Sequence, residues 1–312
     1  MDEEGRIEGL GTARQRAAFD AEAAAILAAL PPPPEAKRRE VPRRTWLYWG
    51  QGWTEAPEVC RLCLESWRRW NPRHEIAALD AARAEALVGP PGFDLGPFPE
   101  RVRSNLLRLR LLSRFGGVWA DATLFCTAPL DAWLPLLTQR AGCFLFSLPE
   151  QEKPISTWFL AGDGASALIA GWGALYRAIL ERHAASGRDL PFYFVMHRSF
   201  LVLLRGRPEA AAEWARCQLV PAAGPLALGN LLDLEGRRGA PQGVPLAPQE
   251  RDRAEALLPA TRCTSCPGRR RWPRAARGRA RRSISAAARS PRRRAARGAS
   301  APAFGAAAGH GG

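Results

Sequence analysis

One acidic residue stands in a segment that is otherwise typical of a buried strand. Asp121 follows the apolar pair Val118 and Trp119 in VWADATLFC, residues 118–126. A buried carboxylate is costly unless it is paired or bound to a cation. Ligands of open α/β sheets collect at the carboxyl ends of the strands. Asp121 is therefore a candidate for holding a divalent metal, through which a diphosphate can be anchored.

A polar stripe precedes this acid on a predicted helix over residues 100–115. Arg101, Asn105 and Arg108 lie at positions i, i+4 and i+7, which places them on one helix face. Asn105 can hydrogen bond to a base or ribose, and Arg108 suits an anion or Asp121 itself. The same residues also fit a structural ion pair between Arg108 and Asp121 on a solvated helix face.

The surrounding elements alternate between strands and helices. Apolar runs predict strands over 45–50, 74–80, 118–126 and 142–148. Helical spacing predicts helices over 13–30, 56–70, 81–89, 100–115 and 164–184. Two further apolar segments cover 155–162 and 191–206. This rhythm is typical of an α/β sheet with crossover helices.

The basic character of the chain is concentrated in its last residues. The 312 residues carry a net charge of +15, but 262–312 contain fourteen arginines and no acidic residue, so 1–261 carry +1. The charge of the whole chain therefore does not indicate a nucleic-acid-binding protein. With 46% hydrophobic residues, the chain has enough apolar material for a core, which excludes wholesale disorder.

The composition also predicts a location and a division into parts. No stretch reaches the ~18 apolar residues of a membrane span, and the acidic start is not typical of a secretory signal. Seven cysteines without an export signal indicate a reducing cytosol. We predict an Ala-rich helical leader with a Pro-rich, charged linker over 1–40, outside the main fold. A main domain over 41–261 and an Arg-rich, disordered tail over 262–312 follow.

The stretch RSNLLRLRLLSRFGGVWADAT resembles the capsular polysaccharide synthesis glycosyltransferases, relatives of the mannosyltransferase-like glycosyltransferase family 32. Their hallmark is a Ser-Asp-x-x-Arg helix, followed by Gly-Gly-x-(Trp or Tyr)-x-Asp and a second polar or acidic position. The matching residues are Ser104, Asn105, Arg108, Gly116, Gly117, Trp119, Asp121 and Thr123. The resemblance covers about residues 42–204 and includes YWGQGW, ISTWFLAG and FYFVMH.

The resemblance implies a GT-A fold, a Rossmann-like nucleotide-sugar-binding domain with a mixed, mainly parallel sheet. It implies a divalent cation, commonly Mn²⁺ (or Mg²⁺), with Asp121 as the metal and diphosphate ligand and Thr123 at the second metal position. Asp121 and Arg108 would be catalytic, and Asn105 and Arg108 would contact the donor. The chain departs from the pattern at Thr123, a neutral and weaker ligand, and at Asn105, which replaces an Asp.

Further site residues follow partly from the resemblance and partly from the chemistry of their side chains. The predicted donor-binding set is Trp49, Ser104, Asn105, Arg108, Gly117, Trp119 and Trp158. His197 is a candidate acceptor-side residue, with a partly buried structural histidine as the alternative. The tryptophans can stack on a base or sugar, and packing explains them equally well.

The predicted function is a cytoplasmic, metal-assisted glycosyltransferase of capsular or other surface polysaccharide synthesis. Its partners would be a nucleotide-sugar donor and a glycan or lipid-linked acceptor, with peripheral association at the inner face of the membrane left open and nucleic acid not expected. The alternatives are a basic-tailed nucleic-acid-binding protein and a catalytically inactive glycosyltransferase relative. The first of these predicts an affinity that falls steeply with salt.

The tail over 262–312 has almost no apolar residues that could form a core. It fits a nucleic-acid-binding tail, a zinc site using Cys263 and Cys266, or a shifted reading frame. A codon string for Arg-Cys-Thr-Ser-Cys-Pro-Gly can read Leu-His-Lys-Leu-Ser-Trp in another frame, which is similar to a C-terminal segment of the resembling family. We therefore hypothesise that the frame slips near Thr261.

Overall fold

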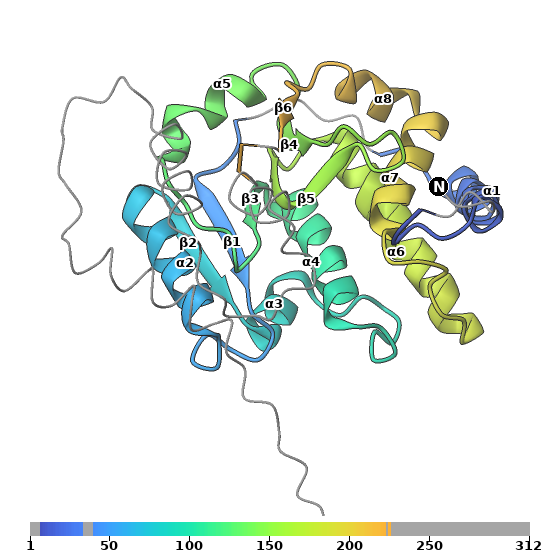
Figure 1. The fold of residues 1–312 in the computed structure, drawn as a ribbon, viewed down its shortest axis with the longest axis horizontal. Coiled ribbons are helices and arrows are strands. Elements are labelled where there is room, and N and C mark those ends of the chain that lie inside the picture. Colours follow the sequence, from blue (N-terminus) through green and yellow to red (C-terminus); the bar gives the residue numbers. More distant parts are fainter. Residues whose placement is uncertain (1–6, 34–39, 223, 226–312) are drawn as a thin grey trace, which may run out of the picture.

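The computed structural model describes residues 7–33, 40–222 and 224–225, and its elements alternate along the chain (Figure 1). The strands are β1 (Arg44–Tyr48), β2 (Glu75–Leu79), β3 (Gly117–Ala120), β4 (Cys143–Ser147), β5 (Ile155–Gly162) and β6 (Val220–Pro221). The helices are α1 (Ala13–Ala29), α2 (Glu58–Trp70), α3 (Ala81–Val88), α4 (Glu100–Phe115), α5 (Leu134–Thr138), α6 (Ala167–Ser186), α7 (Val195–Gly206) and α8 (Pro208–Trp214), with a 3-10 turn at Leu130–Ala132.

The strands form a single mixed sheet in the order β2-β1-β3-β5-β4-β6. β1 pairs in parallel with β2 and β3, and β4 pairs in parallel with β6, whereas β5 is antiparallel to β3 and β4. The predicted α/β class with a mixed, mainly parallel sheet is confirmed. Because β1 and β3 are parallel neighbours, Tyr48 and Ala120 end their strands at the same edge of the sheet.

Alternate side chains of the strands enter two apolar layers, one on each face of the sheet. Trp46 and Trp119 belong to the larger core, which α1, α3, α4, α6 and α7 cover. Their neighbours Leu47 and Val118 belong to the second core, with α2 and α5. This alternation follows from the two-residue period of a strand and gives a layered arrangement with both sheet faces buried.

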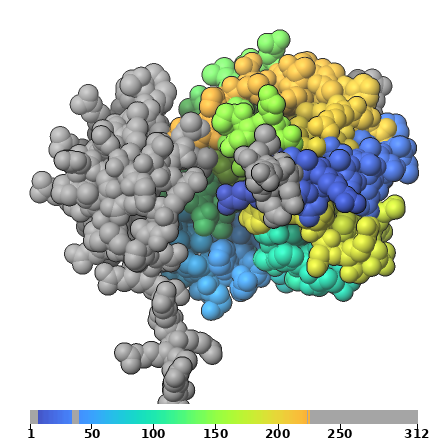
Figure 2. Space-filling model, turned by 45° about the vertical axis from the view of Figure 1, so that its right-hand side comes forward, coloured from blue at the N-terminus to red at the C-terminus, as the bar shows by residue number. Residues whose placement is uncertain are grey.

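The N-terminal helix is part of the folded body, which corrects the prediction that this helix, as part of a leader over 1–40, lies outside the main fold. α1 packs against α6 and α7 (Figures 1 and 2). Phe19, Ala23 and Leu27 are buried in the larger core, and Phe19 meets Phe192 edge-on with ring centroids 5.2 Å apart. The apolar face of the helix was hidden by its alanine content, because a buried alanine and an exposed alanine look alike in the sequence.

The predicted strand over 118–126 is shorter in the structure, where β3 ends at Ala120. The next residues form a turn in which the Leu124 N–H donates to the Asp121 carbonyl at 2.8 Å. Beyond this turn, side chains of α2 form hydrogen bonds with the backbone. Trp67 donates to the Leu124 carbonyl, and Ser66 accepts from the Cys126 N–H. Asp121 consequently lies just beyond the strand rather than within it.

Among the described residues, no helix combines the length and the apolar character that a membrane span requires. The predictions for the tail over 262–312, including its zinc site and the frame slip, lie outside the described residues, as does the end of the domain predicted to extend to 261.

Candidate functional site at the carboxyl ends of β1 and β3

Asp121 lies at the edge of the sheet where parallel strands end, as predicted for a ligand-binding acid. Its N–H donates to the Trp158 carbonyl of β5 at 2.9 Å, which continues the pairing of β3 with β5 by one residue. Its side chain is 36% exposed, so the carboxylate reaches solvent instead of being enclosed in the strand. The carboxylate is therefore accessible from solvent while the backbone is held by the sheet.

Two side chains fix the orientation of this carboxylate. The indole N–H of Trp119 donates to Oδ1 of Asp121 at 2.7 Å. The guanidinium of Arg108 lies 3.2 Å from the same oxygen. Arg108 also stacks on the Trp119 ring, with its Cζ 4.9 Å from the centroid. The three residues therefore form one rigid group, and its carboxylate is the member that reaches solvent.

Arg108 is buried behind the carboxylate. It is 4% exposed, and it donates to the Thr157 carbonyl and to the carbonyl and hydroxyl of Ser104. Burial lowers the pKa of Arg108 from its ordinary value, and the charge of Asp121 opposes that shift. A guanidinium keeps its charge in proteins. The arrangement favours a positioning role for Arg108, whose predicted contact with the donor stays a prediction.

The rest of the α4 stripe is half-buried and contacts protein groups. Asn105 hydrogen bonds with Tyr176 of α6, a buried residue whose pKa rises to about 12, mainly through burial. Arg101 stacks on Tyr193 at 4.1 Å and donates to its carbonyl at 3.1 Å. The alternative of a solvated face is therefore wrong for Arg108, whereas Asn105 is half-buried and the ion pair of Arg108 with Asp121 is present.

Gly117 does not line this site, which corrects its prediction as a donor-binding residue. It begins β3, at the end opposite Asp121. Its φ is +97°, and a Cβ on it would lie 2.6 Å from the Arg44 carbonyl oxygen. Glycine is therefore required at this position so that β3 can approach β1 closely.

The predicted tryptophans lie near Asp121 but are engaged in packing. Trp49 follows β1 and packs in a small cluster with Ala122, directly after Asp121. Trp158 stacks on Phe146 with centroids 4.9 Å apart. Both side chains are half-buried, and their predicted contact with the donor stays a prediction.

Sequence reasoning missed a hydrogen-bonded pair at the same edge of the sheet. The hydroxyl of Tyr48, the last residue of β1, donates to Glu100 Oε1 at 2.6 Å. Burial, followed by the hydrogen bond to Glu100, raises the pKa of Tyr48. A Cβ on Gly50 would lie 2.8 Å from the same Glu100 oxygen. The sequence feature that could have indicated this pair is Glu100 itself, an acidic residue at the start of a helix that follows a Pro/Gly loop.

His197 lies in the first turn of α7 and is 8% exposed. Burial, together with the charges of Lys153 and Arg108, lowers its pKa to about 3, so the imidazole is neutral at physiological pH. Its ring packs edge-on against Phe194, with centroids 4.9 Å apart. The structure places His197 near Arg108, and its acceptor-side role stays a prediction.

The described residues offer few protein ligands for a divalent cation. Asp121 supplies one carboxylate, and Thr123 is an exposed neutral residue two positions on. No group of three His, Cys, Asp or Glu side chains suited to a metal occurs within the described part of the chain. These ligands fit a hard cation that takes its remaining ligands from water and from substrate phosphates, as Mg²⁺ often does.

Comparison with known proteins identifies the family of this chain. The profile of the family described as capsular polysaccharide synthesis protein matches residues 30–237, which is more than half of the chain. This chain belongs to the capsular polysaccharide synthesis protein family. The matched range includes β1, α4, β3 and Asp121, and thus every site residue described above.

Two individual proteins are similar to this family member. Glycosyltransferase afumC of Aspergillus fumigatus (strain CBS 144.89 / FGSC A1163 / CEA10) is 25% identical over 159 residues. The alignment covers 45% of this chain and 41% of that relative, so the chain spans less than half of its length. The solved structure named PaToxG Glycosyltransferase superposes with a TM-score of 0.34 and 13% identity, over 78% of this chain and 93% of that one.

Proposed function

We propose that this protein is a glycosyltransferase. It would move a sugar from a nucleotide-sugar donor to a hydroxyl of a glycan or lipid-linked acceptor, in the synthesis of a capsular or other surface polysaccharide. The observation that carries the proposal is the half-exposed carboxylate of Asp121 at the carboxyl ends of β1 and β3, held by Arg108 and Trp119. Membership of the capsular polysaccharide synthesis family and the name of the Aspergillus relative support it.

The site contains residues that orient the Asp121 carboxylate and a residue placed to contact the substrate. Trp119 and Arg108 are buried and hold Oδ1 of Asp121, so the carboxylate loses little freedom when a ligand binds. Trp49 is half-buried next to the turn that follows Asp121 and offers a ring face for a base or sugar. Preorganisation of this kind lowers the entropic cost of binding and keeps reacting groups aligned.

A carboxylate repels a diphosphate unless a cation lies between them. We therefore propose that a divalent cation, Mn²⁺ or Mg²⁺, is held by Asp121 and Thr123 together with the donor. When bound, it would neutralise the charge that develops on the leaving diphosphate. The protein would act in the cytoplasm, where nucleotide-sugar donors are available.

The proposal is tested with the full 312-residue chain and a panel of UDP-, GDP- and ADP-linked sugars. Nucleoside diphosphate released over time is measured with and without added Mn²⁺ or Mg²⁺. We expect release from at least one donor, because many transferases slowly use water in place of the acceptor. Binding of a donor without release would support the inactive-relative alternative. If no donor in the panel binds or reacts, the proposal is wrong.

Because the protein supplies few metal ligands, we make a separate prediction about the affinity for Mn²⁺. Mn²⁺ alone is expected to bind weakly, because Asp121 supplies one carboxylate and Thr123 a neutral hydroxyl. A nucleoside diphosphate should tighten Mn²⁺ binding by about tenfold or more, since its phosphates complete the coordination. Electron paramagnetic resonance of free Mn²⁺ measures both affinities. Equal affinity with and without the nucleotide would contradict a shared site.

A further inference from the structure

A second group of charged and polar side chains lies where the chain enters α7. Lys153, in the turn between β4 and β5, places its Nζ 4.6 Å from the centroid of the Phe194 ring. Arg101 of α4 stacks on the adjacent Tyr193 and donates to its carbonyl. Two cations from distant parts of the sequence therefore flank the same two aromatic residues.

The first turn of α7 adds hydrogen-bond donors at this place. The residue preceding it, Phe194, provides no side-chain cap, and the first turn contains no acidic residue. Within the part of the chain that the structure describes, no acceptor contacts the N–H groups of Val195, Met196 and His197. The first N–H groups of a helix attract anions, because they are unpaired and lie at the positive end of the helix dipole.

A buried polar atom supplies independent evidence that a group is missing here. Among the described residues, Nδ1 of His197 has no hydrogen-bond partner, and the residue is more than nine-tenths buried. Buried polar atoms are almost always paired in native proteins. Phe194 links this imidazole to Lys153, because its ring packs edge-on against His197 and the ring centroid lies 4.6 Å from Nζ of Lys153. The charges of Lys153 and Arg108 both lower the pKa of His197 and help to keep it neutral. Because Arg108 also contacts Asp121, this region adjoins the candidate active site.

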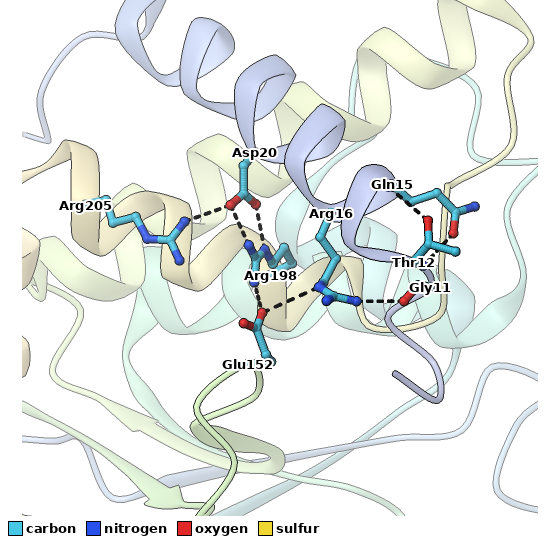
Figure 3. Close-up of polar contacts among 8 residues, drawn as sticks. All are labelled: Gly11, Thr12, Gln15, Arg16, Asp20, Glu152, Arg198 and Arg205. Atoms are coloured by element: carbon cyan, nitrogen blue, oxygen red, sulfur yellow. Dashed lines mark hydrogen bonds and ion pairs between the residues drawn. The ribbon is translucent and has the colours of Figure 1, made fainter. Parts of the chain in front are cut away.

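A network of ion pairs fixes the turn that carries Lys153. Glu152 pairs with the buried Arg198 of α7, which also binds Asp20 of α1 through two hydrogen bonds of 2.6 and 2.5 Å (Figure 3). Arg205 donates to the same Asp20 at 2.7 Å. The carboxylates of Glu152 and Asp20 are thus bound by arginines and do not neutralise Lys153.

Within the described ranges, the ion pair of Lys153 is with Glu150, and that contact is long. Glu150 Oε1 lies 4.0 Å from Nζ, at the limit of an ion pair, and the Glu150 side chain is 52% exposed. The Lys153 side chain is 24% exposed, so the ammonium group has access to solvent. Lys153 is one of two lysines in a chain with 43 arginines. A lysine ammonium is a compact charge with three donors, which suits a phosphate oxygen.

We propose that Lys153 is a phosphate-binding residue, acting together with the free N–H groups in the first turn of α7. The phosphate would belong to the diphosphate of the donor or to a phosphate-linked acceptor. The identity of these substrates rests on the proposed glycosyltransferase function, whereas the phosphate site itself does not. Lys153 would hold this phosphate and so orient the substrate relative to Asp121.

The test measures binding of inorganic phosphate and pyrophosphate to the full chain by calorimetry, with EDTA present to exclude metal. Lys153→Gln is expected to weaken pyrophosphate binding by about tenfold, the effect of losing one charge-assisted hydrogen bond. Lys153→Arg should retain most of the affinity. Arg140→Gln is the matched control, because Arg140 is exposed and its loss removes the same charge elsewhere. Thermal unfolding of each variant verifies that the fold is kept.

Three results would overturn the proposal: no binding by the unmodified chain, equal binding by Lys153→Gln, or an equal loss in Arg140→Gln. The source of the phosphate is distinguished by saturating the chain with UDP or GDP first. Loss of phosphate binding then assigns the site to the donor, and retained binding assigns it to the acceptor. Because these titrations need no turnover, they separate failure of this site from failure of the glycosyltransferase proposal.

Discussion

Replacing Asp121 with asparagine is expected to reduce nucleotide-sugar turnover by about 100- to 1,000-fold while leaving the protein folded. The amide oxygen can still accept the hydrogen bond from Trp119, so the local geometry survives. The negative charge that would hold the cation and diphosphate is lost, and loss of one such electrostatic contact in an active site costs a factor of this size. Arg108 loses its charged partner, at a cost of about 1–2 kcal/mol in the free energy of unfolding.

The control for this experiment is Asp94→Asn. Asp94 is exposed, and its carboxylate accepts a hydrogen bond from the Gly96 N–H in the loop before α4. This variant makes the same chemical change outside the site and is expected to keep full turnover. Steady-state rates of nucleoside diphosphate release, with melting temperatures measured in parallel, distinguish the two variants. Full activity in Asp121→Asn would remove this residue from the mechanism.

Truncating Phe19 to alanine is expected to lower the free energy of unfolding by about 3–5 kcal/mol. Phe19 is 3% exposed and packs α1 onto the larger core, where its ring meets that of Phe192. The truncation leaves a cavity between α1 and the body and weakens the position of Asp20, the next residue, which binds Arg198. Denaturant unfolding followed by tryptophan fluorescence measures the change.

Arg14→Ala provides the comparison on the same helix. Arg14 is exposed, and its substitution is expected to change stability by less than about 0.5 kcal/mol. If Phe19→Ala were as stable as Arg14→Ala, α1 would be a loosely attached leader, as the sequence first suggested. A large difference between the two variants supports α1 as an integral part of the fold.

The secondary structure could be predicted where the apolar pattern is local. The run TWLYWG gave a strand because aromatic and β-branched residues fill four of the five positions before a glycine, and the structure places β1 there. The helix before Gly116 was evident from its leucine spacing and from the two glycines that end it. Asp121 was recognisable because an acid in an apolar strand needs an explanation, and the structure places it at the strand end.

The partners of the site residues could not be predicted, because they come from distant parts of the chain. Arg108 binds the Thr157 carbonyl, 49 residues away, and Asn105 meets Tyr176 on α6. No local pattern encodes such contacts. Lys153 was missed for the same reason: its significance depends on Phe194 and His197, which reach it only after α7 has packed. The helical period showed a polar stripe on α4 but not whether protein or solvent faces it.

The length of β3 could not be predicted for a different reason. The apolar letters of VWADATLFC continue past Ala120, and a strand over the whole segment fits the sequence. The strand stops because Trp67 and Ser66 of α2 hydrogen bond to the backbone at Leu124 and Cys126. Tertiary hydrogen bonds thus override a local strand preference. In the same turn, Ala122 packs in a cluster with Trp49, and the carboxylate of Asp121 is exposed to solvent.

The location of the donor is the claim on which the proposed function depends most, and hydrogen exchange tests it directly. Amide exchange of the full chain is compared with and without a saturating nucleoside diphosphate and Mn²⁺. The segments that end β1 and β3, residues 48–53 and 119–124, should become protected, because they contain Trp49 and Asp121. Protection confined to other parts of the chain, with these two segments unchanged, would contradict a donor site at the carboxyl ends of β1 and β3.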